Sequence, residues 1–260
     1  MIQLKKNEEE LTQHVMGKIS LSKDKSKLEK HVVSLSKTVV DLSHKSGVDL
    51  GATSAKVVVV LDYSGSMNSL YHNGTVQNTI NRLVPLGLTF DDNGTIDVFL
   101  FSNDYRKITD LNLGNYEDYV KKVVFTSGYQ MGGTSYAPVL KAIIEGETKK
   151  GLFGFGKKVK QEAIVDDGDP TFILFITDGE NADKAASDAI IRKSSELNVF
   201  IQFIGIGNER FNYLRQLDDM PGRRRDNTGF SKMSDLNKAS DSELYTNVLE
   251  QFSDWLNGLQ

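Results

Sequence analysis

The stretch Val57-Val-Val-Val-Leu-Asp62-Tyr-Ser64-Gly-Ser66-Met67 decides the fold of this chain. Its valines and leucine predict a strand that is buried on both faces, as in a parallel sheet covered by helices. Asp62 then falls at the carboxyl end of the strand, where open α/β sheets bind their ligands. Gly65 permits a sharp turn, and the segment from Val76 to Leu88 is predicted to continue as a helix.

This turn gathers oxygen atoms. Asp62, Ser64 and Ser66 bring one carboxylate and two hydroxyls to one place, and donors that are all oxygen favour a hard cation such as Mg²⁺ over zinc or copper. Taken alone, the stretch agrees equally well with a serine-rich turn that only caps a helix.

Two later segments favour the metal site. Gly132-Gly-Thr134-Ser is a flexible loop that carries a hydroxyl just before a helical stretch, and Thr171-Phe-Ile-Leu-Phe-Ile-Thr-Asp178 is a second buried strand that ends on an aspartate. Because parallel strands end at the same edge of a sheet, Asp62 and Asp178 are expected to lie close together there.

In these residues the chain resembles the von Willebrand factor A domain and its metal-ion-dependent adhesion site. The family motif is Asp-x-Ser-x-Ser, a distant Thr and a later Asp, which Asp62, Ser64, Ser66, Thr134 and Asp178 match in order. The resemblance implies that the hydroxyls ligate Mg²⁺, with Mn²⁺ or Ca²⁺ as alternatives, while the two carboxylates mostly hold its waters. One coordination position is then left for an Asp or Glu of a protein partner. Other residues near the motif either frame the rim of the site or simply pack: Tyr71, Tyr136 and Asn181.

The chain resembles one subgroup of the A-domain family in particular. From about Leu28 to the C-terminus, the chain is similar to bacterial and phage A-domain proteins associated with tellurite-resistance and stress-response (Ter) gene clusters. Segments that carry this similarity include Phe90–Val98, Gly132–Pro138 and Ile176–Asn181. A role in such a system follows by analogy alone, because one fold hosts many functions.

Composition sets further limits. The chain has 260 residues, no cysteine and a net charge of −4. These features exclude disulfides and thiolate metal sites, and they disfavour general nucleic-acid binding. We found neither a signal-peptide core nor an apolar run of membrane-spanning length, so a soluble cytoplasmic protein is expected. The oligomeric state is not predicted.

Strand and helix patterns alternate after residue 55, which predicts βαβ units in a Rossmann-like, doubly wound, mostly parallel sheet. Residues 51–260 are expected to form this domain. The predicted strands are Lys56–Asp62, Thr95–Ser102, Lys107–Asp110, Thr171–Thr177, Val199–Gly205 and Gly229–Met233. The predicted helices are Val76–Leu88, Tyr116–Val123, Tyr136–Glu145, Lys184–Leu197, Arg210–Asp218 and Ser242–Leu256.

Residues 1–50 are expected to form a helical extension. An apolar stripe predicts an amphipathic helix over about Lys27–Ser43, and Ser26-x-x-Glu29 has the form of a capping box. The stripe is expected to pack on the domain, with a coiled-coil or oligomer contact as the alternative. A short helix after Asn7 is also compatible with the sequence. The stripe consists of Leu28, Val32, Leu35, Val39 and Leu42.

A glycine- and lysine-rich segment interrupts the pattern at 146–170, and we interpret it as a mobile inserted loop. Gly151–Lys157 resembles part of a phosphate-binding loop, but no buried strand precedes it and Lys158 replaces the required Ser or Thr. Phe153 and Phe155, among lysines, are an alternative contact surface for a partner or an anionic surface. Gly222–Arg225 is expected to be a solvated loop.

The sequence therefore predicts an adhesion-type binding module with no catalytic residues. The competing hypothesis is a Mg²⁺-dependent phosphohydrolase in which Asp62 acts as a nucleophile. The sequence disfavours it, because the second acid two residues after Asp62 is missing. The four histidines also lie outside the motif segments, and no Gly-x-Ser-x-Gly elbow occurs.

Overall fold

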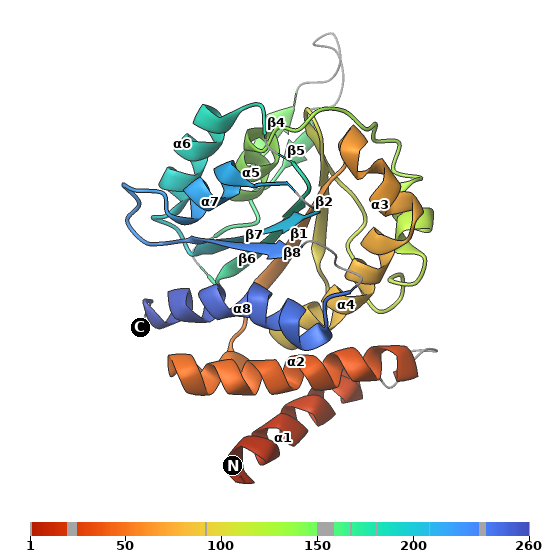
Figure 1. Ribbon diagram of the computed structural model, residues 1–260, viewed down its shortest axis with the longest axis vertical. Coiled ribbons are helices and arrows are strands. Elements are labelled where there is room, and N and C mark those ends of the chain that lie inside the picture. Colours follow the sequence, from red (N-terminus) through yellow and green to blue (C-terminus); the bar gives the residue numbers. More distant parts are fainter. Residues whose placement is uncertain are drawn as a thin grey trace.

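The computed structural model describes residues 2–19, 25–91, 93–149, 159–166, 168–179, 181–207, 209–233 and 238–259. Its centre is a six-stranded sheet in the order β3-β2-β1-β6-β7-β8 (Figure 1). Every neighbouring pair is parallel except β2 and β3. The predicted doubly wound, mostly parallel sheet is confirmed. The strands are β1 (Lys56–Asp62), β2 (Asp97–Phe101), β3 (Tyr105–Lys107), β6 (Thr171–Thr177), β7 (Val199–Ile206) and β8 (Thr228–Met233).

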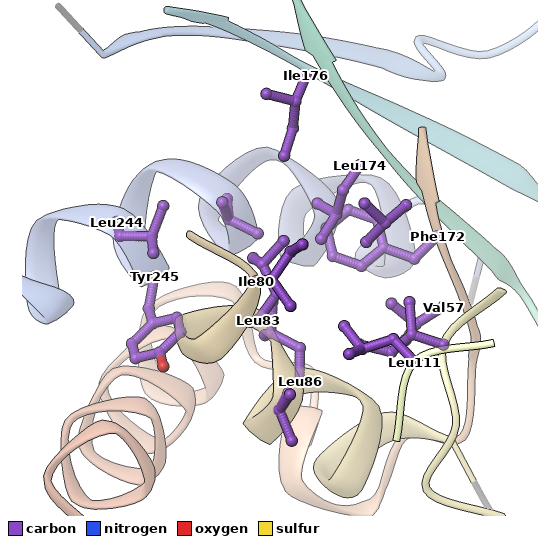
Figure 2. Close-up of a cluster of buried hydrophobic side chains, with 14 of the residues drawn as sticks. Val57, Ile80, Leu83, Leu86, Leu111, Phe172, Leu174, Ile176, Leu244 and Tyr245 are labelled. Atoms are coloured by element: carbon purple, nitrogen blue, oxygen red, sulfur yellow. The ribbon is translucent and has the colours of Figure 1, made fainter. Parts of the chain in front are cut away.

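Alternate residues of the central strands enter two separate apolar cores. In β1, Val57, Val59 and Leu61 lie in one core, whereas Val58 and Val60 lie in the other. The first core is closed by helices α4 (Thr75–Phe90) and α8 (Asp241–Asn257), as Figure 2 shows for side chains from β1, β6, α4 and α8. The second is closed by α5 (Ala137–Ile144), α6 (Lys184–Ser194) and α7 (Asn212–Asp218).

The shorter elements differ from the predictions. The strand expected at Lys107–Asp110 lies earlier, because Tyr105–Lys107 pairs with Phe99–Phe101 through a tight turn. The helix expected at Tyr116–Val123 is reduced to a π-helical turn, η3 (Val120–Val124). Three short helices have no counterpart among the predicted elements: η1 (Leu50–Ala52), η2 (Gly65–Met67) and α3 (Asn68–His72).

The N-terminal extension consists of α1 (Ile2–Ile19) and α2 (Lys25–Ser46). All five residues of the α2 stripe are at most 3% exposed, and α2 packs against α8 and α4 with α1 outermost (Figure 1). The predicted packing on the domain is confirmed. The predicted capping box is wrong, because Ser26 lies inside α2. Helix α1 is longer than the short helix expected after Asn7.

A charged cluster joins α2, α4 and α8. The Asp241 carboxylate lies 2.7 Å from His31 Nδ1 and 2.7 Å from Arg82 Nε. Arg82 also donates to the Ala239 carbonyl at 2.9 Å, and the Tyr245 hydroxyl donates to the Arg82 carbonyl at 2.7 Å. Burial raises the pKa of Asp241, but the hydrogen bonds and charges of His31 and Arg82 outweigh burial and lower that pKa overall.

The segment expected to be a loop at 146–170 contains paired strands. β4 (Glu147–Lys149) and β5 (Val159–Gln161) pair with each other in antiparallel orientation. The residues of the phosphate-loop pattern, including Phe153 and Phe155, lie outside the described residues, so those predictions are untested.

The arginine-rich segment 222–225 is only partly a solvated loop, as two of its side chains are anchored. Arg223 forms an ion pair with Asp226, and its side chain is 6% exposed. Arg225 donates to the Leu197 carbonyl at 2.7 Å and lies over the Trp255 ring. Among the described residues, no helix has both the length and the apolar composition needed to cross a membrane.

Candidate metal site

The site lies at the carboxyl edge of the sheet, between two neighbouring strands. Asp62 is the last residue of β1, and Asp178 directly follows β6. β1 and β6 are parallel, with Leu61 opposite Ile176. The strand ends therefore bring these two aspartates to the same edge, as the sequence predicted.

Four of the five predicted residues form one hydrogen-bonded group. The Ser66 hydroxyl donates to Asp178 Oδ1 at 2.8 Å, and the Ser64 and Ser66 hydroxyls lie 3.1 Å apart. The Ser64 amide donates to Asp62 Oδ1 at 2.8 Å. Ser66 is exposed, so the group is open to solvent on one side.

Asp62 is the buried end of this group. It is 0% exposed, and its second oxygen accepts a hydrogen bond from the Thr177 hydroxyl at 2.6 Å. Burial is the main cause that raises the pKa of Asp62 to about 6, and the nearby charge of Asp178 adds to it. Burial also raises the pKa of Asp178. Thr177 was not among the predicted site residues, and its only signal in the sequence is its place directly before Asp178.

Thr134 is placed beside this group through its backbone. Gly132 forms a bridge with Ser64 and accepts a hydrogen bond from the Gly65 amide at 3.1 Å. The Thr134 carbonyl accepts from the Ala182 amide at 2.8 Å. The loop thus lies between the Asp62 turn and the segment that follows Asp178. Ligation by the Thr134 hydroxyl stays a prediction.

The residues considered for the rim are supporting residues instead. The Tyr71 hydroxyl donates to the Asp62 carbonyl at 2.8 Å, and the Tyr136 hydroxyl donates to the Gly179 carbonyl at 2.7 Å. Both rings are buried. The Asn181 amide group donates to Asp183 at 2.9 Å and to Ser187 at 2.8 Å. These contacts fix the backbone that carries the site.

The donor set fits a hard divalent cation. Its side-chain atoms are carboxylate and hydroxyl oxygens, which suit Mg²⁺, Mn²⁺ or Ca²⁺. Within the described ranges, neither Asp62 nor Asp178 forms an ion pair with a Lys or Arg side chain. The same part of the chain holds no group of three His, Cys, Asp or Glu placed for a metal ion. A site here would therefore depend on the serine and threonine hydroxyls.

This arrangement at the carboxyl edge of a doubly wound sheet agrees with the von Willebrand factor A domain that the motif residues resemble. A family profile described as the vWA domain found in the TerF C terminus matches residues 54–260. The chain therefore belongs to the vWA-TerF-like family.

One curated relative and several solved structures are similar to this chain. The uncharacterized protein YcbR of Bacillus subtilis (strain 168) is 35% identical over 209 residues, which are 80% of this chain and 79% of the relative. Proximal thread matrix protein 1 from the mussel byssus is 15% identical, with a TM-score of 0.47 over 77% of this chain and 48% of that one. Its structure with a zinc-occupied MIDAS motif is 16% identical, with a TM-score of 0.43 over 78% and 47%.

The ArnB paralog VWA2 from Sulfolobus acidocaldarius is 19% identical, with a TM-score of 0.42 over 77% of this chain and 46% of that one. The chain thus spans about half the length of these solved chains.

Proposed function

We propose that this chain is a metal-dependent protein-binding module. The observation that carries the proposal is the hydrogen-bonded group of Asp62, Ser64, Ser66 and Asp178 at the carboxyl edge of the sheet. Ser64, Ser66 and Thr134 would ligate Mg²⁺, or Mn²⁺ or Ca²⁺ in its place, and the two aspartates would hold its waters. A cation held mainly by neutral hydroxyls keeps much of its charge, so it would attract a carboxylate from an Asp or Glu of a partner.

The surroundings of Asp62 support binding over phosphate chemistry. A nucleophilic carboxylate needs an oxygen that can reach the substrate. Asp62 is 0% exposed, and its two oxygens accept hydrogen bonds from the Ser64 amide and the Thr177 hydroxyl. A Mg²⁺-dependent phosphohydrolase is therefore the second candidate. Release of phosphate from nucleotides or a phosphoester by the wild type, lost in Asp62→Asn, would favour it.

The biological setting we propose is a tellurite-resistance or stress-response system in the cytoplasm. Membership of the vWA-TerF-like family supports it.

Capture of partners from native lysate, with Mg²⁺ or with EDTA, tests the binding proposal. We expect EDTA to remove the specific partners of the wild type, and Thr134→Ala to remove the same partners while leaving the fold intact. Tyr63→Phe is the matched control, because the Tyr63 ring is buried and lies edge-on against Tyr71 at 5.1 Å. It should retain the partners. Capture of the same partners in the presence of EDTA and by Thr134→Ala would contradict the proposal.

A further inference from the structure

Asp183, which was not among the predicted site residues, links two parts of the candidate metal site. It lies at the start of α6, and its carboxylate accepts hydrogen bonds from the backbone amides of Tyr136 and Ala137, each at 3.0 Å. The Asn181 side-chain amide at 2.9 Å and the Ser187 hydroxyl at 3.0 Å donate to it as well. Asn181 and Ser187 are buried, so this carboxylate is held in one orientation.

These bonds connect the two segments that carry Thr134 and Asp178. The amides of Tyr136 and Ala137 begin the helix that follows the Thr134 loop, where a negative charge is favourable. Asp183 itself belongs to the segment that follows Asp178. Two further bonds join the same segments: the Ala182 amide donates to the Thr134 carbonyl at 2.8 Å, and the Tyr136 hydroxyl donates to the Gly179 carbonyl at 2.7 Å.

The other side of the Thr134 loop is held less firmly by side chains. Asn103, in the turn between β2 and β3, accepts a hydrogen bond from the Gly133 amide at 3.0 Å, and Asn103 is exposed. The Ser135 amide donates to the Ser102 carbonyl at 2.8 Å. A Cβ at Gly133 would lie 2.6 Å from Asn103 Oδ1, so this close approach favours glycine. Asp183 is therefore the stronger side-chain attachment of the Thr134 loop, because its carboxylate has several hydrogen-bond donors and buried neighbours, whereas Asn103 is exposed.

We propose that Asp183 is a positioning residue for the metal site, which holds the Thr134 loop against the Asp178 segment before the ion binds. This inference rests on the proposed function. Without the carboxylate, part of the binding free energy would be used to order the loop, so affinity would fall while the number of sites stayed the same. Changes to groups that orient metal ligands typically reduce affinity about 10–100-fold.

Calorimetric titration of the chelator-treated full chain with MnCl₂ or MgCl₂ tests this role. Asp183→Asn is the informative variant. One of the two backbone amides, that of Tyr136 or of Ala137, would then face the NH₂ group of asparagine instead of an acceptor. We expect one site with about 10-fold or more weaker binding. Asn103→Ala should weaken binding less.

Asp188→Asn is the matched control for stability, since it alters a carboxylate on the same helix whose partner is the Tyr213 hydroxyl at 2.8 Å. It should keep the wild-type affinity. Thermal melts of all variants identify any that fail to fold. Amide hydrogen exchange supplies a second readout, with faster exchange at Tyr136 and Ala137 expected in Asp183→Asn and not in Asp188→Asn.

The outcomes separate the inference from the function. If the wild type binds the ion and folded Asp183→Asn binds it equally well, Asp183 has no positioning role and the metal site stands. An equal loss of affinity in Asp188→Asn would also overturn the role, because the effect would then be general destabilisation. If the wild type binds neither ion, both the metal site and the role of Asp183 are wrong. Slow exchange at Tyr136 and Ala137 in both variants would show that other contacts hold the loop.

Discussion

Two carboxylates of this domain, one buried and one only partly buried, are stabilised in opposite ways. Asp241, where α2, α4 and α8 meet, has a guanidinium and an imidazole as partners, and they lower its pKa despite burial. Asp62, at the carboxyl edge of the sheet, has a backbone amide and a hydroxyl as partners, and burial raises its pKa to about 6.

The difference distinguishes a structural cluster from the candidate metal site. The charge of Asp241 is balanced by side chains, so the cluster joins the N-terminal extension to the domain. The hydrogen bonds to Asp62 are not accompanied by a cationic side chain among the described residues, and Asp178 adds a second negative group close by. Negative charge is therefore concentrated at the place where the proposed cation would bind.

The largest expected effect comes from deleting the N-terminal helices, which the Asp241 cluster joins to the domain. Deletion of residues 1–48 removes the α2 stripe and uncovers the apolar faces of α4 and α8. Each buried Leu or Val contributes about 1.5–3 kcal/mol, so the five together are comparable with the whole free energy of unfolding of a typical domain. We expect aggregation or a strongly lowered melting temperature by calorimetry and gel filtration. A monomeric truncation as stable as the full chain would contradict the importance of this packing.

A smaller effect is expected from opening the Asp241 cluster. Arg82→Ala removes a side chain that is 4% exposed and leaves Asp241 without its closest guanidinium. Breaking a fully buried pair costs about 3–5 kcal/mol. Because the Asp241 side chain is 20% exposed, we expect a loss near the lower end of that range, which chemical denaturation would measure. Lys122→Ala is the control, because its pair with Asp118 is 65% exposed on both sides and should contribute little. Equal effects of the two substitutions would show that the cluster is not structural.

The pH dependence of stability offers a finer test. The folded pKa of Asp241 is lowered, so its stabilising contribution is fully present above its unfolded pKa, about 4. It is lost as the pH falls through the lower folded value. The difference in unfolding free energy between wild type and Asp241→Asn should therefore be greatest above pH about 5 and should shrink below about 4. A difference that grew on acidification would have the wrong sign.

The sequence was sufficient for the features that depend on local patterns. The bounds of β1 and β6 were predicted correctly, because alternate apolar residues of each strand fill two cores. Asp62, Ser64, Ser66 and Asp178 could be predicted to meet because both strands end at one sheet edge.

Side-chain attachments between distant segments could not be read in this way. The bond from Thr177 to Asp62 spans 115 residues, and Asp183 contacts amides 46 and 47 residues earlier in the chain. Neither contact leaves a periodic pattern. The paired strands at Glu147–Lys149 and Val159–Gln161 were missed for a related reason, since each has only three residues.

Titration with metal ions tests most directly whether an ion binds at the carboxyl edge of β1 and β6. The full chain is compared with one variant of each carboxylate. Wild type, Asp62→Ala and Asp241→Asn are freed of metal with chelator and titrated with MgCl₂ and MnCl₂ in a calorimeter. We predict one site in the wild type, the same site with unchanged affinity in Asp241→Asn, and no detectable binding in Asp62→Ala. Equal binding by Asp62→Ala and the wild type would contradict the account, because the ion would then be held somewhere other than the carboxyl edge of β1 and β6.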